Sequence, residues 1–436
     1  MTTRSVEPPR NAGPISRRRF LAAAAAGLAA GVAGCSTTAP SAARARVVVV
    51  GGGYGGATTA RYLRIWGGEA IDVTLVEANE SFVSCPLSNL VVGGSRTMAD
   101  ITRSYDGLAR RGVRIVHDTA TAVDAERRQV RLASGATLPY DRLVLSPGVD
   151  FFFDRVEGLA DPAAQARFLH AWKAGPQTVA LRRQLEAMPD GGVYAISIPR
   201  APYRCPPGPY ERACQVAWYF QRAKPRSKVL ILDGNEDVQS KKALFTRAWS
   251  ESYKGIVEYR PNYVLTGVDA ATSTARFETA DDERADVLNV IPPHGAGAIA
   301  RQAGVVTVND QWCEVDFRTF ESIKVAGVHV LGDAIQTASA MPRSGHMANQ
   351  HGKIAAAAIL AALDGHAFEP PTINNTCYSY FSDREAAHIA SVHRFDAAAK
   401  TYVAVAGASG LSAAMSVAEG DYGQAWAASI WADMLG

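Results

Sequence analysis

The stretch Val47-Val48-Val49-Val50-Gly51-Gly52-Gly53-Tyr54-Gly55-Gly56, near the start of the chain, decides the fold. Four consecutive valines predict a fully buried strand, and Gly51, Gly53 and Gly56 follow it with the spacing GxGxxG. The first glycine permits a tight turn, the second lets a pyrophosphate approach the backbone, and the third lets the next helix pack closely on the strand. That helix, predicted over 57–65, presents its positive end to the phosphates. The stretch therefore predicts a dinucleotide-binding turn.

An acidic residue in register completes the motif. Residues 71–76 read as a second buried strand, and Glu77 follows it, twenty-one residues beyond Gly56. A carboxylate at this point can accept hydrogen bonds from both ribose hydroxyls of the nucleotide. Strand, turn, helix, strand and acid occur here in the required order, so a chance surface loop of glycines is the weaker interpretation.

The first forty-three residues read as an export signal and linker. Arg17, Arg18 and Arg19 precede Phe20-Leu21 and an alanine-rich run over 22–33, which is too short to span a membrane. Paired arginines followed by Phe-Leu are typical of twin-arginine signals, so we expect a periplasmic protein that is exported folded. The sequence before Cys35 also resembles a lipoprotein cleavage box. Because ordinary cleavage sites carry small residues too, a lipid anchor on Cys35 and a free periplasmic protein are both open.

Charge and cysteine spacing narrow the class of protein further. The whole chain carries a formal charge of +3, but residues 1–34 hold five arginines and Glu7, so their removal leaves a chain near minus one. Nothing in that balance suggests a nucleic-acid partner. The five cysteines after Cys35 form neither a CxxC pair nor a CxxCH motif. We therefore expect no metal site and no c-type haem on this chain.

A second unit, predicted over 151–285, repeats the strand-helix-strand pattern without the glycines. Strands are expected over 192–198 and 228–233, with a helix over 211–222 between them. The turns after the two strands read Pro199-Arg200-Ala201-Pro202-Tyr203 and Gly234-Asn235-Glu236-Asp237-Val238, and neither has GxGxxG. Bulky residues and prolines there would obstruct phosphates. We infer a Rossmann-like domain that does not bind NAD(P)H.

The chain is then expected to return to the first domain. A crossover strand is predicted over 286–293, a strand over 328–333 that ends at Asp333, and a helix over 346–363. Asp333 is a candidate for binding the cofactor, and a helix cap is the alternative interpretation of this residue.

The length of 436 residues predicts several domains, which we place at 1–43, 44–150, 151–285, 286–370 and 371–436. Beyond Gly51, Gly53, Gly56 and Glu77, the cofactor-binding candidates in the first domain are Ser146, Gly148, Gly332, Asp333 and Ser344.

From Arg46 to its end, the chain resembles the flavoprotein subunit of flavocytochrome c sulfide dehydrogenase, which is related to sulfide:quinone oxidoreductases and to disulfide-reductase-like flavoproteins. The matching stretches are collinear: Val49 to Gly53, Cys85 with Leu87-Ser88-Asn89, Ala201 to Arg212, Trp312-Cys313, Thr319 to Ser322, and Asn375 to Tyr378. The resemblance implies an α/β fold of two Rossmann-like domains, as in glutathione reductase, with a smaller C-terminal interface domain. It also implies FAD as the cofactor and a sulfide-cytochrome c reductase activity.

The resemblance assigns roles to three cysteines. Cys85 matches the position whose sulfur is bonded to the flavin, which implies covalent FAD; otherwise it is a buried thiol. Cys205 and Cys377 match a redox-active disulfide facing the flavin, and a purely structural disulfide is the alternative. Hydrosulfide is a good nucleophile for such a bond, and attack leaves a persulfide and a thiolate. The segment after Cys205, Pro206-Pro207-Gly208-Pro209, predicts a stiff loop. Cys214 and Cys313 are interpreted as packing residues.

Glu211 matches a glutamate near that disulfide. In an apolar pocket its pKa would rise, so that it could take a proton from H₂S, although a carboxylate favoured by the helix dipole is an equally good interpretation. His346 and His351 lie five residues apart and do not share a helix face, so we interpret them as packing or surface residues.

The resemblance implies that electrons leave through a c-type cytochrome subunit. Trp426 and Trp431 are candidates for its docking surface or for a dimer contact, or else for the core. Two other functions are open from the sequence. The first is a sulfide:quinone oxidoreductase held at a membrane by the C-terminal tail, although residues 412–436 contain no Lys or Arg. The second is a non-catalytic flavin or thiol carrier in sulfur oxidation.

Overall fold

The first sheet is built around the valine strand. In the computed structural model, which describes residues 44–436, β1 (Ala45–Val50) lies between β2 (Ile71–Val76) and β9 (Arg142–Leu145), and all three run parallel. The strand order is β19-β20-β21-β9-β1-β2-β5, which adds β5 (Arg114–Val116), β19 (Val315–Asp316), β20 (Glu321–Ser322) and β21 (Val328–Val330). Because β21 pairs with β9, the chain does return to this sheet late in the sequence. Residues 1–43, with the predicted export signal and Cys35, lie outside the described residues.

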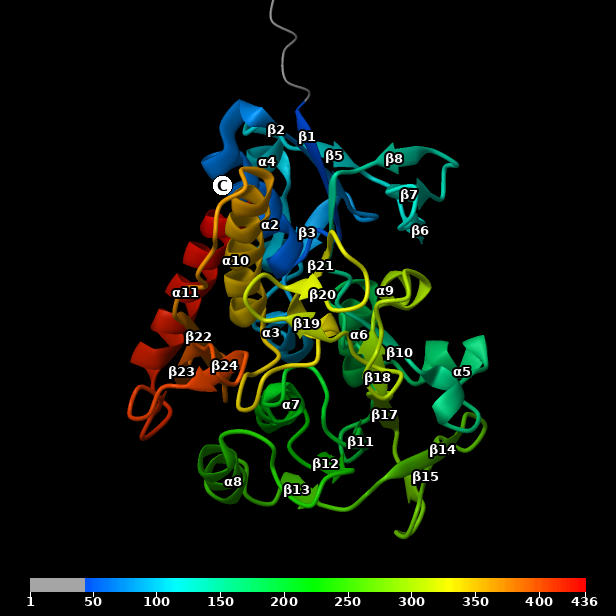
Figure 1. Cartoon of the computed structure of the whole chain (residues 1–436). Helices are drawn as coiled ribbons and strands as arrows, with labels where there is room; N and C mark the ends of the chain where they lie inside the picture. The colour runs from blue at the N-terminus through cyan, green and yellow to red at the C-terminus, as the bar shows by residue number, and fades with distance from the viewer. Residues whose placement is uncertain (1–43) are drawn as a thin grey trace, which may run out of the picture. The chain divides into compact units, whose positions relative to one another are not determined.

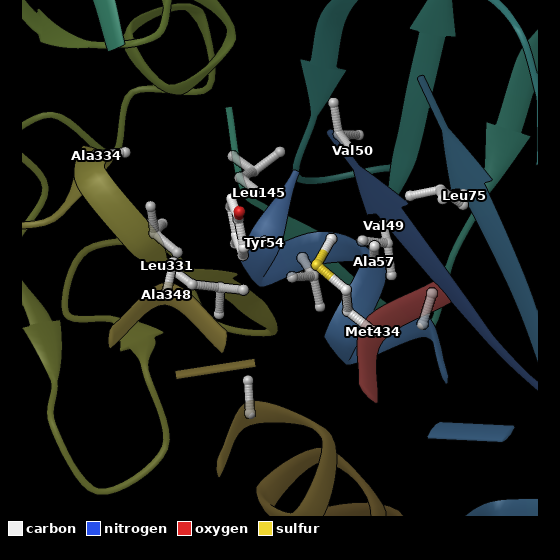
Figure 2. Close-up of a cluster of buried hydrophobic side chains, with 14 of the residues drawn as sticks. Val49, Val50, Tyr54, Ala57, Leu75, Leu145, Leu331, Ala334, Ala348 and Met434 are labelled. Atoms are coloured by element: carbon white, nitrogen blue, oxygen red, sulfur yellow. The ribbon is translucent and has the colours of Figure 1, made fainter. Parts of the chain in front are cut away.

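Helices close the apolar face of this sheet. Helix α2 (Tyr54–Gly67) follows the glycine turn and packs against α10 (Gly345–Leu363), as Figure 1 shows. The two helices bury small and apolar side chains against the sheet, including Ala57, Leu75, Leu145, Leu331 and Ala348 in Figure 2. Small side chains let helix and strand backbones approach closely, which fixes where the turn between them lies.

Short strands and helices connect the strands β2, β5 and β9 of the first sheet. They are β3 (Ser81–Val83), α3 (Ser88–Gly93), β4 (Thr102–Ser104), α4 (Asp106–Arg110) and the antiparallel strands β6 (Ala120–Asp124), β7 (Gln129–Leu132) and β8 (Thr137–Pro139). Cys85 lies between β3 and α3, and it lines the same cavity as Gly51 of the glycine turn.

The second sheet is parallel throughout, with the order β13-β12-β11-β17. It consists of β11 (Val193–Ile198), β12 (Lys228–Asp233), β13 (Val257–Arg260) and β17 (Val287–Val290), with helices α6 (Pro176–Ala187), α7 (Gly208–Ala223) and α8 (Lys242–Ser250). The crossover strand predicted over 286–293 forms as β17, but its place in the first domain was wrong. Its side chains are buried beside β11, so the second domain extends past residue 285.

Smaller elements lie in the connections between and within the two sheets. They are β10 (Val149–Phe151), α5 (Pro162–Arg167), β14 (Leu265–Asp269), β15 (Thr274–Phe277), β16 (Glu283–Arg284), β18 (His294–Ala296) and α9 (Ala298–Gln302). Strands β10 and β18 pair antiparallel, so the outgoing and returning connections run side by side. The mixed α/β fold with two Rossmann-like sheets confirms the predicted class.

The C-terminal region forms an antiparallel sheet and a helix. Its strands are β22 (Ile373–Tyr380), β23 (Ala386–Asp396), β24 (Thr401–Ala404) and β25 (Gly410–Leu411), and α11 (Val417–Leu435) ends the chain. Trp431 is buried, and its indole N–H donates to the Tyr54 hydroxyl at 3.2 Å. Trp431 is therefore a core residue, the third of the interpretations that the sequence left open. Within residues 44–436, no helix is both long and apolar enough to cross a membrane.

Candidate active site

The glycine turn between β1 and α2 has the geometry that the motif requires. Gly51 has φ +97°, and a Cβ there would lie 2.3 Å from the carbonyl oxygen of Ser146. A Cβ on Gly56 would lie 1.9 Å from the carbonyl oxygen of Gly51. Gly53 is different, because nothing stands within 4 Å of its missing side chain. Two of the glycines thus close the turn, and the third leaves room for a ligand.

A cleft of about 500 Å³ opens in front of this turn, and we call it the nucleotide cleft. It brings together eight of the predicted cofactor-binding residues: Gly51, Gly53, Glu77, Cys85, Ser146, Gly148, Gly332 and Asp333. One carboxylate oxygen of Glu77 accepts the N–H of Gly52 at 2.7 Å, and the other accepts the N–H of Asn79 at 2.9 Å. The acid is therefore held at the cleft wall.

The residues of the nucleotide cleft fit a dinucleotide. The Oδ1 atom of Asp333 is buried and has no hydrogen-bond partner, so it is an acceptor that a hydroxyl of a bound ligand can satisfy. The N-terminus of α2 has no side-chain cap, which leaves its N–H groups for phosphate oxygens. Ser344 lies elsewhere: its Oγ caps α10 by accepting the N–H of Met347 at 3.1 Å, and it lines the neighbouring cavity instead.

That neighbouring cavity of about 80 Å³ holds the predicted catalytic residues, and we call it the cysteine cavity. Cys85, Cys205, Cys377 and Glu211 all line it. They come from four elements: the loop before α3, the loop before α7, strand β22, and the first turn of α7. The two cavities share Cys85, Pro86, Arg204, Asp333 and Gly345, so they adjoin. The fold thus joins three cysteines that are distant in sequence at one end of the nucleotide cleft.

Cys205 is presented by a tightly held loop, residues 199–207, which we call the cysteine loop. The backbone of Cys205 itself is left-handed, with φ +54°, which is unusual for a residue other than glycine. The N–H of Cys205 donates to the carbonyl of Arg343 at 3.2 Å, and its own carbonyl accepts the N–H of Gly208 at 2.9 Å. A Cβ on Gly208 would lie 3.0 Å from the Cys205 sulfur, so glycine is needed where the sulfur passes the helix.

The Cys205 and Cys377 thiols are both disfavoured as thiolates by burial, which raises their pKa values. All five cysteines among the described residues are free in the structure, so the Cys205–Cys377 disulfide stays a prediction. Cys214 and Cys313 are fully buried in hydrophobic clusters, which confirms their interpretation as packing residues.

Arg204 ties Cys85 to the nucleotide cleft. The Cys85 sulfur accepts the N–H of Ala174 at 3.4 Å, and the Arg204 guanidinium lies 3.6 Å from the Asp333 carboxylate. Burial opposes the charge of Arg204, but Cys85 and Asp333 together hold its pKa above the ordinary value. An arginine at the junction of the two cavities supplies positive charge where an anionic group would meet the protein.

Glu211 is buried at the start of α7, with 7% of its surface exposed. Burial raises its pKa from 4.5 to about 7, although the Lys241 ammonium and the N–H of Tyr380 act in the opposite direction. The shift agrees with the expected proton-accepting group. The helix-dipole interpretation also holds in part, because the residue does lie in the first helical turn.

Sequence reasoning missed Arg204 as a residue of the cysteine cavity. It named His346 as a packing or surface residue and Trp426 as a docking, dimer or core residue, and both of them line this cavity. Arg204 stands next to Cys205, so its place in the motif was a usable signal. The Nδ1 atom of His346 accepts the N–H of Thr376 at 2.9 Å, whereas His351 is buried and stacks on Phe320. Among the described residues, no group of three His, Cys, Asp or Glu side chains could hold a metal ion.

The fold and this site define a flavoprotein of the disulfide-reductase type. A pyridine nucleotide-disulphide oxidoreductase family model matches residues 45–178. The sulfide dehydrogenase [flavocytochrome c] flavoprotein chain, central model matches residues 178–292, and the flavocytochrome c sulphide dehydrogenase, flavin-binding model matches 369–435. The chain belongs to the family of FAD flavoproteins that contains sulfide dehydrogenases and sulfide:quinone oxidoreductases.

Individual relatives agree with this family. The chain is 25% identical over 290 residues to the mitochondrial sulfide:quinone oxidoreductase of Dictyostelium discoideum, which covers 64% of this chain and 63% of that protein. It thus spans less than two thirds of the length of this curated relative. A short match over 38 residues, 63% identical, links it to the sulfide dehydrogenase flavoprotein chain of Chlorobaculum thiosulfatiphilum and covers 9% of this chain and 77% of that sequence.

Solved structures share the fold. The sulfide:quinone oxidoreductase of Aquifex aeolicus superposes with a TM-score of 0.69 at 16% identity, covering 89% of this chain and 91% of that one. A putidaredoxin reductase in covalent complex with putidaredoxin gives a TM-score of 0.62 at 19% identity, with 80% and 81% covered.

Proposed function

We propose that the protein is a periplasmic, FAD-dependent sulfide dehydrogenase that passes electrons to a c-type cytochrome. One observation carries the proposal: Cys205 and Cys377 line one small cavity with Glu211, and this cavity adjoins the nucleotide cleft. A pair of cysteines beside a flavin site is suited to two-electron chemistry on sulfur. The family models over 178–292 and 369–435 support the same substrate class.

The sulfur chemistry runs through the cysteine pair in its disulfide form. Hydrosulfide attacks one sulfur, a new S–S bond forms, the old one breaks, and its electron pair stays on the second cysteine as a thiolate. A second hydrosulfide then removes the outer sulfur of the persulfide as HS₂⁻ and leaves the attacked cysteine as a thiolate. The two cysteine thiolates re-form the disulfide when they lose two electrons, and FAD held in the nucleotide cleft would supply the acceptor for them. In total, two hydrosulfides give HS₂⁻, a proton and two electrons.

Glu211 is the group that would accept the proton of H₂S in this reaction. A carboxyl group with a pKa of about 7 is half protonated near neutral pH, so it can both accept and release a proton there. It lines the same cavity as both cysteine sulfurs. The residue would take the proton of H₂S and so keep the nucleophile in its anionic form.

We also propose that Cys85 is the covalent tether of FAD. Its support is position: Cys85 lines both the nucleotide cleft and the cysteine cavity, beside Arg204. Acid denaturation of the purified protein tests the tether. The yellow colour should stay with the wild-type polypeptide and leave that of Cys85→Ala. Colour that is lost from the wild type, or kept by the variant, would overturn the assignment.

The second sheet supports the exclusion of NAD(P)H. Asp233 ends β12, where an acid would meet a nucleotide ribose in a dinucleotide-binding domain. Its carboxylate is buried and already accepts the hydroxyls of Tyr210 at 2.7 Å and of Tyr259 at 3.1 Å. The preceding strand β11 runs into the cysteine loop instead of a glycine turn. Asp233 is thus occupied by hydrogen bonds within the protein, and the loop after β11 presents Cys205 where a phosphate-binding turn would lie.

Anaerobic stopped-flow mixing with sulfide tests the function. Sulfide should bleach the flavin absorbance of the wild type within the turnover time. If sulfide does not bleach the oxidised protein, the enzyme proposal is wrong and a non-catalytic carrier is favoured. Adding c-type cytochrome or a soluble quinone to the reduced protein then identifies the acceptor. We expect fast reoxidation by the cytochrome; a preference for quinone would favour the sulfide:quinone oxidoreductase.

Location is tested separately, on the full-length chain expressed in a bacterium. We propose export by the twin-arginine signal, so replacing Arg17, Arg18 and Arg19 by lysine should retain the protein in the cytoplasm. The mass of the exported N-terminus decides between a lipid on Cys35 and ordinary cleavage.

A further inference from the structure

Lys241 is a buried cation that no part of the reaction described so far uses. It precedes α8 in a left-handed conformation, φ +54°, and 5% of its surface is exposed. Its ammonium donates to the Ser379 hydroxyl at 2.9 Å. Within residues 44–436, no carboxylate lies at ion-pair distance from it. Burying an ammonium without a counter-ion is costly, so the charge calls for an explanation.

The position of Lys241 relates it to the cysteine pair. Ser379, which binds its ammonium, follows Cys377 by two residues on β22, and residues two apart on a strand face the same side of the sheet. Ser240, next to Lys241 in sequence, lines a separate cavity of about 280 Å³ together with Cys205 and Cys377. The lysine therefore reaches the pair from the side of the C-terminal sheet.

The other positive charges near the pair are already held by other groups. Arg212, which also lines the cysteine cavity, donates to Asn89 and Asn289 and to the carbonyls of His170 and Ala171. Arg204 is paired with Asp333 at the nucleotide cleft. The guanidinium of Arg343 stacks on Trp312 at 3.9 Å and donates to the carbonyl of Ile335 at 3.1 Å. His346, on the wall of the cysteine cavity, has its pKa lowered by burial, so it is neutral near pH 7.

Glu211 works against a negative charge on the cysteines, whereas Lys241 favours it. The Glu211 carboxylate raises the pKa of both Cys205 and Cys377, and the Lys241 ammonium lowers the pKa of both, against the larger effect of burial. Lys241 is thus a positive charge, with no carboxylate at ion-pair distance among residues 44–436, that acts on both sulfurs and on Glu211. Arg204 also lowers the pKa of Cys205, but its guanidinium is paired with Asp333.

We propose that Lys241 is a positioning residue whose charge stabilises the cysteine thiolate released when the Cys205–Cys377 disulfide is attacked. This inference rests on the proposed function. In the step concerned, a bond forms between the entering sulfur and one cysteine, the S–S bond of the pair breaks, and the electron pair moves onto the other cysteine. The lysine keeps its proton and takes no part in bond formation.

The test measures thiolate formation without turnover. In the reduced, flavin-loaded protein, the rate of alkylation of Cys205 and Cys377 by iodoacetamide is followed against pH by peptide mass spectrometry. Lys241→Met, which removes the charge, should shift the alkylation profile to higher pH by about one unit. At a fixed pH below the thiol pKa, the alkylation rate should therefore be roughly tenfold lower. Lys241→Gln, which can keep the bond to Ser379, should do the same and serves if the Met variant does not fold. Lys241→Arg should restore the wild-type profile, and Ser379→Ala, which keeps the charge, should leave it unchanged.

Each outcome decides the point. A wild-type profile in both neutral variants, or a displaced profile in the Arg variant, would overturn the role of the charge. Sulfide reduction of flavin should also slow about tenfold in the neutral variants, in line with the alkylation shift. If wild-type protein is not reduced by sulfide at all, the proposed function fails, whereas the alkylation profiles still decide whether Lys241 sets the ionisation of the pair.

Discussion

Two turns at equivalent places in the fold do different work. The glycine turn joins the central strand β1 to α2, and the cysteine loop joins the central strand β11 to α7. In the first, Gly51 and Gly56 pack backbone against backbone and Gly53 leaves space in the nucleotide cleft. In the second, prolines and a left-handed Cys205 bring a sulfur into the cysteine cavity. A strand-to-helix connection at the carboxyl end of a parallel sheet can thus serve phosphate binding or sulfur chemistry, depending on the loop.

The largest effect is expected from closing the space that the glycine turn needs. Gly56→Ala would place a Cβ at 1.9 Å from the carbonyl oxygen of Gly51, so strand and helix would have to separate. We expect a loss of about 5 kcal/mol in the free energy of unfolding and no bound flavin. Denaturant unfolding and flavin content measure both effects.

The control for this change is Gly135→Ala. Gly135 also has a positive φ, +87°, but nothing lies within 4 Å of its missing side chain. It should cost about 1 kcal/mol from backbone strain alone and keep full flavin content. Equal losses in the two variants would contradict the close packing argued for the glycine turn.

The cysteine loop should respond in the opposite way. Cys205→Ser removes the reacting sulfur but keeps the fold and the nucleotide cleft, so flavin content should stay at the wild-type level. The rate constant of flavin reduction by sulfide should fall at least about a thousandfold, or about 4 kcal/mol. Stopped-flow absorbance measures it, with Cys214→Ala as the packing control, which should reduce at the wild-type rate. A wild-type rate of flavin reduction by sulfide in Cys205→Ser would show that the cysteine pair does not carry the reaction.

The contrast between the turns also explains what the sequence could predict. The glycine turn is local, so the valine strand, GxGxxG and Glu77 sufficed to place β1, α2, β2 and the cleft in advance. The residues of the cysteine loop gave only negative evidence. The absence of glycines argued against a phosphate-binding turn, but it did not indicate what the loop does instead. The resemblance to a family supplied Cys205, Cys377 and Cys85, and the structure then placed all three on one cavity.

Long-range packing decided what remained. Strand β17 was assigned to the wrong sheet because a buried strand has the same apolar pattern beside β11 as it would have in the first sheet. Lys241 and Trp426 carry no local signal, since a single lysine or tryptophan is common on any surface or core. Lys241 comes near the cysteines through its contact with Ser379 on β22, and Trp426 through the packing of α11 against β22 and β23.

Glu211 gives a pH dependence of intermediate size. Its pKa is raised from 4.5 to about 7 in the folded protein, so the native state binds a proton more tightly than the unfolded chain. Stability should therefore be full below pH 4.5, fall as pH rises, and be lower by about 3 kcal/mol above pH 7. Glu211→Gln should remove this slope and be more stable than the wild type above pH 7. Unfolding curves across the pH range measure the difference, and exposed Glu80→Gln should leave the slope unchanged.

Asp333 should have a smaller effect, confined to the nucleotide cleft. Its buried Oδ1 has no partner in the protein, so Asp333→Asn replaces one acceptor for a ligand hydroxyl by a donor. We expect FAD to bind about tenfold more weakly, or about 1.4 kcal/mol, because a single hydrogen bond of this kind is worth that much. The measurement needs the Cys85→Ala background, so that a covalent bond does not mask the affinity. Unchanged affinity there would remove Asp333 from the cofactor site.

The smallest effect should come from NADH, and it sharpens the comparison most directly. Asp233 is occupied by two tyrosine hydroxyls, and the cysteine loop fills the place of a phosphate turn, so the second sheet offers a dinucleotide neither of its usual contacts. Anaerobic mixing with NADH should leave flavin absorbance unchanged, while sulfide bleaches it in the same preparation. Tyr259→Phe, which removes one of the hydroxyls on Asp233, should still not respond, because Tyr210 and the loop remain. Bleaching by NADH at the rate seen with sulfide would mean that a Rossmann-like sheet can bind the nucleotide without a glycine turn, and the contrast between the two turns would lose its functional meaning.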